Sequence, residues 1–167
     1  MNNDLFSTDK KESFINEFRP KNLEDFIGQE HLLGKNKVLR KVIEQDKVTS
    51  IIFYGPPGTG KTSLARIISE YSKSSFIEIN ATGTSVKDIR EIALKSREKK
   101  NFYKKKTILF IDEVHRLNKA QQDVLLPYIE NEDIIFIGST TFNPFFYITP
   151  ALGSRSLLFE FKKLTLE

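Results

Sequence analysis

The stretch Ile51-Ile-Phe-Tyr-Gly55-Pro-Pro-Gly-Thr-Gly60-Lys61-Thr62 decides the fold of this chain. Four apolar residues come first, and a loop rich in glycine and proline follows them. After the loop, Leu64, Ile67, Ile68 and Tyr71 have the spacing of the buried stripe of a helix. The stretch therefore predicts a buried strand, a tight loop and a helix in direct succession.

Further runs along the chain resemble this first strand. Residues 108–111, 134–137 and 157–161 are apolar at nearly every position, which is typical of strands buried on both faces of a parallel sheet. Residues 76–79 alternate more, which favours an edge strand. Helical patterns separate the runs, so the sequence predicts an α/β fold in which helices cover a parallel sheet through right-handed crossovers.

The helices carry their own start signals. Residues 35–45 have amphipathic spacing and predict a helix before the first strand. Ser85 with Asp88, and Asn118 with Gln121, each have the spacing of a capping box and predict two helix starts. Pro127 falls inside the second of these helices, where we expect it to kink or shorten the helix.

Composition narrows the class of protein. The 167 residues suit one domain, and 26 basic against 22 acidic side chains give a mild net charge of +4, which permits a polyanionic partner without requiring one. The chain has no cysteine and two histidines, so disulfides, cysteine nucleophiles and histidine-based metal sites are not expected. No apolar run approaches the length of a membrane span, so we expect a cytoplasmic protein without a membrane partner. The first dozen residues are polar with no periodic apolar pattern, and residues 1–17 are expected to form a mobile N-terminal arm.

The loop matches the pattern G-x-x-x-x-G-K-[ST], between a predicted strand and a predicted helix. Its backbone N–H groups and the helix N-terminus are suited to holding phosphate oxygens, with Lys61 at the β- and γ-phosphates and the Thr62 hydroxyl on Mg²⁺. A glycine-rich turn that matches by chance is the alternative. The residues predicted to bind ATP or ADP here are Gly55, Pro56, Pro57, Gly58, Thr59, Gly60, Lys61, Thr62 and Ser63.

Two acids end the strand at residues 108–111. In open α/β sheets ligands bind beyond the carboxyl ends of the strands, which is where Asp112 and Glu113 fall. Asp112 is the expected Mg²⁺ ligand, directly or through water, and Glu113 is placed to polarise an attacking water. Two solvated acids at a strand end are the alternative.

With these two motifs the chain resembles the AAA+ ATPases, and within them the replication-associated recombination protein A (RarA) family. The resemblance covers about residues 18–164. It rests on Arg19-Pro-Lys-Asn-Leu-Glu-Asp-Phe-Ile-Gly28, Thr107-Ile-Leu-Phe-Ile-Asp-Glu-Val-His-Arg116, Leu125-Leu-Pro-Tyr-Ile-Glu130, Phe136-Ile-Gly-Ser-Thr-Thr141 and Ala151-Leu-Gly-Ser-Arg155.

The resemblance implies further site residues. Ile27 and Gly28 would line the adenine site, and Thr141 would be the sensor at the end of the fourth strand, with Asn143 as a second candidate. Arg155 would be an arginine finger that reaches the nucleotide of a neighbouring subunit. A strand-end hydroxyl bonded to backbone is the alternative for Thr141, and a surface ion pair is the alternative for Arg155.

The resemblance also implies an organisation and a function. The strand order would be 5-1-4-3-2, and residues 18–167 would be the nucleotide-binding subdomain, truncated before the family's helical lid. The implied activity is Mg²⁺-dependent ATP hydrolysis, very weak in this chain alone, in a homo-oligomer acting on DNA at stalled or damaged replication forks and associated with the nucleoid. A nucleotide-binding module without hydrolysis and a protein-remodelling motor stay open as alternatives.

Three weaker signals remain. Residues 99–106 mix five lysines with Phe102 and Tyr103, which favours a solvated loop before a buried strand over a nucleic-acid contact. The aromatic residues at 145–147 favour core packing over a DNA or subunit contact. The run at 112–115 also echoes the acid box of two-lobed helicases, but no second lobe accompanies it.

Overall fold

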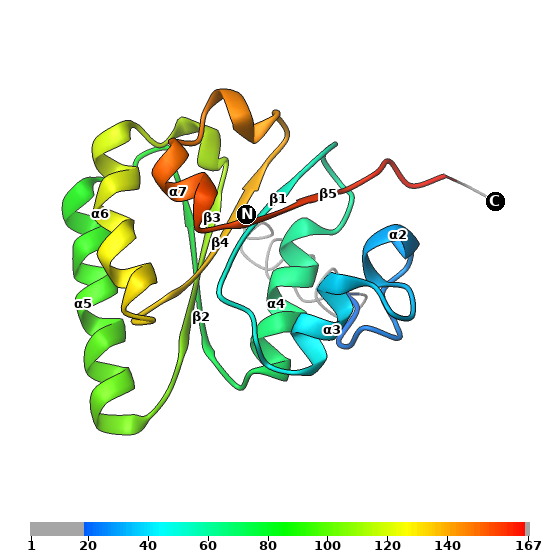
Figure 1. Ribbon diagram of the computed structural model, residues 1–167, viewed down its shortest axis with the longest axis horizontal. Coiled ribbons are helices and arrows are strands. Elements are labelled where there is room, and N and C mark those ends of the chain that lie inside the picture. Colours follow the sequence, from blue (N-terminus) through cyan, green and yellow to red (C-terminus); the bar gives the residue numbers. More distant parts are fainter. Residues whose placement is uncertain (1–18, 166–167) are drawn as a thin grey trace, which may run out of the picture.

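The computed structural model describes residues 19–165 and contains one sheet of five parallel strands, in the order β2-β3-β4-β1-β5 (Figure 1). This is the predicted order 5-1-4-3-2 read from the other edge, so the fold class is confirmed. The predicted arm at residues 1–17 lies outside the described residues. The strands are β1 (Ser50–Tyr54), β2 (Ser75–Asn80), β3 (Thr107–Asp112), β4 (Ile135–Thr140) and β5 (Leu157–Glu160).

Helices cover both faces of the sheet (Figure 1). One face carries α2 (Glu30–Leu33), α3 (Val38–Glu44) and α4 (Lys61–Tyr71), and the other carries α5 (Val86–Tyr103), α6 (Lys119–Glu130) and α7 (Pro150–Ser154). Two short 3-10 helices, η1 (Val114–Arg116) and η2 (Pro144–Phe146), follow β3 and β4. No helix of the described residues is long and apolar enough to cross a membrane.

The three central strands are buried on both sides because their side chains alternate between two apolar layers. Phe53 and Phe110 lie in the layer under α3 and α4, whereas Ile52 and Leu109 lie in the layer under α5 and α6. Continuous apolar runs are what such a sheet needs, which is why β1, β3 and β4 could be predicted from their sequences.

The two edge strands differ from this pattern. The alternating run at residues 76–79 forms β2 at one edge, as predicted. The run at 157–161 was expected to be buried on both faces, and that expectation is wrong. β5 is the other edge strand and its four residues are exposed or half-buried, while the fully buried Phe161 comes just after it. An apolar run cannot distinguish an edge strand from a central one by itself.

Both predicted capping boxes form. The Ser85 side chain accepts a hydrogen bond from the Asp88 backbone N–H, Asn118 accepts one from Gln121, and both reciprocal bonds are present. The predicted shortening of α6 at Pro127 is wrong, because the helix continues to Glu130. Pro127 is exposed, so water can satisfy the backbone carbonyl that loses its partner.

A core substitution tests how much this packing contributes. Phe53 is fully buried on β1 and meets the Phe161 ring edge-on, with 5.0 Å between centroids. Phe53→Ala is expected to lower the free energy of unfolding by about 3–5 kcal/mol. Denaturant titration measures it, with Phe146→Ala as the control, because Phe146 is 81% exposed. Equal stability of the two variants would contradict the assigned core.

Candidate nucleotide-binding site

A groove of about 480 Å³ opens at the carboxyl ends of the central strands. The loop after β1, the acids after β3 and the end of β4 meet there. Most of the residues predicted for phosphate binding and catalysis line it, although they come from three separate parts of the chain. The lining residues are Pro57, Gly58, Thr59, Gly60, Lys61, Thr62, Ser63, Asp112, Glu113, His115, Ser139, Thr140 and Thr141.

The loop needs glycine at two positions for a clear steric reason. Gly55 has a φ of 142°, and a Cβ there would lie 2.2 Å from the backbone oxygen of Phe161. Gly60 has a φ of 97°, and a Cβ there would meet the Phe26 ring at 2.6 Å. Any other residue would push the loop off its neighbours, so these glycines set the path of the loop.

Lys61 begins α4 and turns back into the loop. Its Nζ donates hydrogen bonds to the backbone oxygens of Gly55 at 2.8 Å and Pro56 at 2.7 Å. Burial lowers the pKa of Lys61, and the nearby Asp112 carboxylate partly opposes that shift. The ammonium group is therefore held inside the loop, where backbone oxygens are its present partners and phosphate oxygens would be stronger ones.

The two acids after β3 have different surroundings. Asp112 ends the strand and its Oδ1 accepts a hydrogen bond of 2.9 Å from the Glu113 backbone N–H. Glu113 has a φ of 53°, a left-handed conformation that is uncommon outside glycine and that clusters at functional sites. Its Oε2 lies 3.4 Å from the Thr82 hydroxyl and 3.9 Å from Arg116 Nε. The bend carries the second carboxylate to the rim of the groove.

The donor set suits a magnesium ion. Thr62 and Asp112 both line the groove, and their hydroxyl and carboxylate oxygens are the hard donors that Mg²⁺ prefers. Mg²⁺ usually takes few protein ligands and completes its shell with waters and substrate phosphates. Within residues 19–165 no group of three or more His, Asp or Glu side chains could hold a metal. The oxygens of Thr62 and Asp112 therefore fit a magnesium ion that completes its shell with the phosphates of a nucleotide.

The end of β4 presents two threonines in different ways. Thr140 is buried, and its Oγ1 lies 2.8 Å from His115 Nδ1 and accepts a bond from the Phe142 backbone N–H. Burial lowers the pKa of His115, although the nearby Glu113 carboxylate opposes that shift. Thr141 is exposed in the groove, whereas Asn143 does not line it and caps η2 through Phe145. Of the two predicted sensor candidates, Thr141 is the one in the groove.

A second groove, of about 460 Å³, lies on the other side of the same loop. It shares Gly58, Thr59, Gly60 and Ser63 with the first groove, and its far wall comes from the segment around Phe26 and Ile27. Ile27 is 84% exposed, which leaves its side chain free to cover a flat ring. Gly28 does not line this groove, but Leu164 approaches it closely. The loop thus separates a polar groove suited to phosphates from a groove with an apolar wall.

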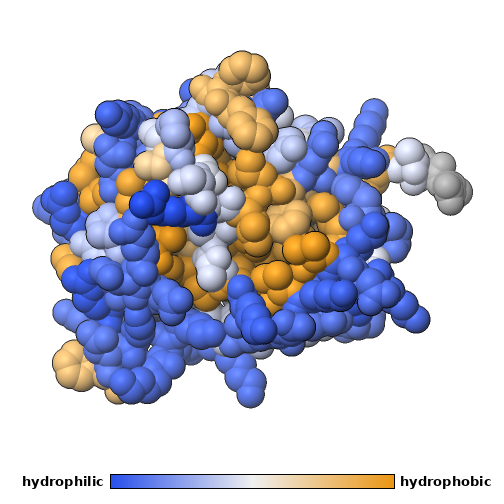
Figure 2. Space-filling view, viewed as in Figure 1, coloured by the Kyte–Doolittle hydropathy of each residue, from blue (hydrophilic) through white to orange (hydrophobic). Residues whose placement is uncertain are grey.

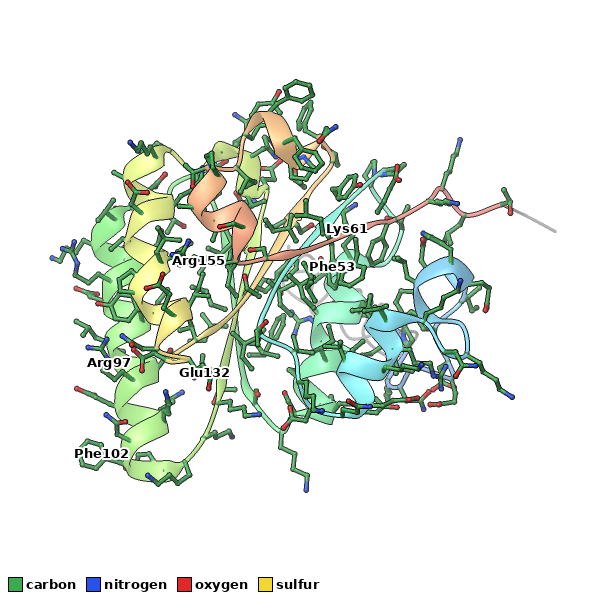
Figure 3. The ribbon with its side chains drawn as sticks, in the orientation of Figure 1. Phe53, Lys61, Arg97, Phe102, Glu132 and Arg155 are labelled. Carbon is green, nitrogen blue, oxygen red and sulfur yellow. The ribbon has the colours of Figure 1, made fainter. Side chains whose placement is uncertain are left out.

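Arg155 is far from both grooves along the strand direction. It follows α7 and precedes β5, at the amino end of the sheet, whereas the phosphate loop follows the carboxyl end of β1 (Figure 3). Its Nε donates a 2.6 Å hydrogen bond to Glu130 and its Nη1 donates one of 2.8 Å to the Ala151 backbone oxygen. The fold therefore does not bring Arg155 to the nucleotide site of its own subunit.

Sequence reasoning missed some residues that line or border the groove. Ser139, Thr140 and His115 line it, and Thr82 contacts Glu113 from the loop after β2. One signal was available, because Thr82 follows an edge strand at its carboxyl end, where ligands bind. The aromatic run at 145–147 was expected in the core, and that is wrong: Phe145 and Phe146 are 75% and 81% exposed. Figure 2 shows apolar side chains projecting at the upper edge, where η2 lies in Figure 1.

The sequence profile of the ATPase family associated with various cellular activities (AAA) matches residues 51–163, the part of the chain that builds this site. The chain belongs to the AAA family of ATPases. The expected place within that family is also confirmed, because the chain is 45–48% identical to two proteins named replication-associated recombination protein A. Its AAA+ core is of the RarA type.

The relatives are similar over nearly the whole chain. The chain is 48% identical over 147 residues to replication-associated recombination protein A of Haemophilus influenzae, covering 88% of the chain and 33% of that protein. It is 50% identical over 161 residues to the ATPase WRNIP1 of Dictyostelium discoideum, covering 95% of the chain and 18% of that protein. The AAA+ chain described here thus spans a third or less of the length of these two relatives.

A solved structure supports the same fold. The RuvB Holliday junction branch migration motor of Thermotoga maritima matches with a TM-score of 0.69 and 30% sequence identity. The match covers 89% of this chain and 50% of that one. The shared fold and family imply nucleotide binding, and they place this AAA+ core among relatives named for replication-associated recombination.

Proposed function

We propose that this AAA+ core binds ATP with Mg²⁺ and hydrolyses it to ADP and phosphate. One observation carries the proposal: the phosphate loop, two adjacent acids and a threonine meet in a single groove. Lys61 would bind the β- and γ-phosphates, and the second groove beside Ile27 would hold the adenine. Bound Mg²⁺, held by Thr62 and Asp112, would neutralise charge on the phosphates.

Glu113 is the proposed base for the attacking water. Its carboxylate would accept a proton as the water oxygen forms a bond to the γ-phosphorus and the bond to the bridging oxygen of ADP breaks. Thr141 would orient the water or contact the γ-phosphate from the end of β4. Arg155 of one subunit would supply positive charge to the site of a neighbour, since it lies away from its own groove.

We infer that the whole protein couples this hydrolysis to DNA at stalled or damaged replication forks. The similarity to proteins named for replication-associated recombination supports this inference. A forked DNA substrate should stimulate the ATPase of the oligomer, whereas denatured protein substrates should not. Stimulation by protein substrates alone would instead favour a protein-remodelling motor.

A module that binds nucleotide without hydrolysing it is the second candidate. The position of Arg155 favours it for an isolated subunit, because that subunit's own site lacks the finger. Turnover per subunit that rises with subunit concentration would favour hydrolysis over binding alone, since a module without activity stays inactive at every concentration. Turnover is measured as phosphate release at fixed ATP.

Lys61→Ala is expected to abolish measurable ATP binding. The substitution removes the buried ammonium group. Each hydrogen bond that this group would donate to a charged phosphate oxygen is worth about 1.5–3 kcal/mol of binding free energy. Direct titration with a fluorescent nucleotide measures the affinity. Lys73→Ala is the control, because Lys73 is exposed beyond the end of α4 and lines neither groove. Unchanged affinity in Lys61→Ala would remove the loop from the site.

A further inference from the structure

Two large aromatic side chains that are adjacent in sequence are exposed to solvent at the C-terminal end of α5. Phe102 and Tyr103 are each 79% exposed, on the last turn of the helix. Figure 3 shows Phe102 at the free end of α5, pointing away from the protein. The rings therefore do not pack under the following loop. Aromatic side chains usually bury a large area, so two neighbouring free rings suggest a ligand.

Positive charge surrounds the two rings. Lys100 pairs with Asp133 and Lys106 with Asp46, whereas Lys99, Lys104 and Lys105 form no ion pair with any residue in 19–165. Cations near a helix C-terminus are favourable in themselves, because they face the partial negative charge of the last carbonyls. That effect acts within about one turn and accounts for lysines, but it gives no reason for the exposed rings.

The C-terminal end of α5, which carries Phe102 and Tyr103, is held in place by the rest of the fold. Arg97 on α5 donates a 2.9 Å hydrogen bond to the buried Asp133 and lies over the Tyr128 ring, at 5.0 Å from its centroid. The backbone N–H of Lys104 bonds to the carbonyl of Lys100 and closes the helix. The end of α5 is thus anchored to α6 and the turn after it. A surface ordered in advance loses less entropy when a ligand binds.

We propose that the C-terminal end of α5 binds single-stranded DNA, with Phe102 and Tyr103 stacked on unpaired bases and Lys99, Lys104 and Lys105 on phosphates. The choice of DNA rests on the proposed function. Unpaired bases offer faces for stacking, which a closed duplex does not, and the free lysines match a chain of phosphates. The rings have no such use against a purely acidic partner.

The position of this surface is compatible with a nucleotide in the groove. The end of α5 leads into the amino end of β3, whereas Asp112 and Glu113 lie at the carboxyl end of the same strand. Single-stranded DNA and ATP would therefore occupy opposite ends of the strands. Binding of one should not displace the other.

The stacking is tested by fluorescence anisotropy with a labelled oligothymidylate, without nucleotide and at low salt. Phe102→Ala/Tyr103→Ala is expected to weaken binding by at least about fivefold, because stacking on one aromatic ring is worth roughly 1–3 kcal/mol. The matched control is Phe145→Ala/Phe146→Ala, which removes two equally exposed rings on η2. A loss in the control pair alone would place the contact on η2 and overturn the proposal.

The phosphate contacts are tested by salt dependence. Lys104→Ala/Lys105→Ala should weaken binding. The slope of log affinity against log salt concentration should become less negative by roughly 1.4, about 0.7 for each lost phosphate contact. Lys35→Ala/Lys37→Ala, which removes two exposed lysines elsewhere, should leave the slope unchanged. The aromatic double variant should lower affinity without changing the slope.

Three other outcomes would overturn the proposed DNA site, and a fourth would separate it from the proposed ATP hydrolysis. Wild-type affinity in both α5 variants, no binding by the wild type, or binding of duplex DNA or phosphatidylserine vesicles alone would each exclude the site. ATP hydrolysis without DNA should be equal in the wild type and both variants. If the protein hydrolyses no ATP but loses oligothymidylate binding in the α5 variants, the DNA contact stands and the proposed hydrolysis fails.

Discussion

Arg155→Ala is expected to lower ATP turnover of the oligomer by about 10³–10⁵-fold and to leave ATP binding by each subunit unchanged. A finger stabilises charge that develops on the transferring phosphoryl group, so its loss affects the rate and spares the ground state. The side chain lies between α7 and β5, bonded to Glu130 and to the Ala151 carbonyl, and cannot serve its own groove. To reach a neighbour's γ-phosphate it must leave or share these partners.

Mixing experiments test whether the finger acts between subunits. Arg155→Ala subunits mixed with Lys61→Ala subunits should regain activity, because some interfaces then pair an intact finger with an intact loop. Arg66→Ala is the matched control, since Arg66 forms a similar half-exposed ion pair with Glu78. Mixed oligomers that stay inactive, or an Arg155-dependent rate that does not change with concentration, would contradict a role in trans.

Glu113→Gln is expected to lower turnover by about 10²–10⁴-fold while Mg·ATP binding stays near the wild-type value. The amide keeps the shape of the side chain but cannot accept the proton of the attacking water. Single-turnover phosphate release measures the rate, and titration with a fluorescent nucleotide measures the affinity.

The control for this substitution is Glu91→Gln, which changes an exposed glutamate on α5 that lines neither groove. It should hydrolyse ATP at the wild-type rate. If Glu113→Gln also did so in the oligomer, Glu113 would not be the base, and another group at the rim would have to activate the water.

The sequence by itself determined the elements whose signals are local. A phosphate loop needs glycines at set positions and a strand and helix on either side, so Gly55 and Gly60 could be read directly. Capping boxes join residues three apart, so Ser85 and Asn118 could be recognised without any tertiary contact. A strand that is buried on both faces has an unbroken apolar run, so the central strands could be predicted from the sequence. The position of the two acids at the end of β3 could then be predicted as well.

Only the tertiary structure decided which distant residues meet. It placed Lys61 on the carbonyls of its own loop, Thr141 in the same groove as Glu113, and Arg155 on Glu130 at the other end of the strands. It also exposed the rings of η2, which were expected in the core, and placed Phe102 and Tyr103 on the last turn of α5, where a solvated loop was expected. The physical reason is that burial and pairing depend on what packs against a residue. Those neighbours come from other strands and helices, so they cannot be predicted from the sequence around the residue itself.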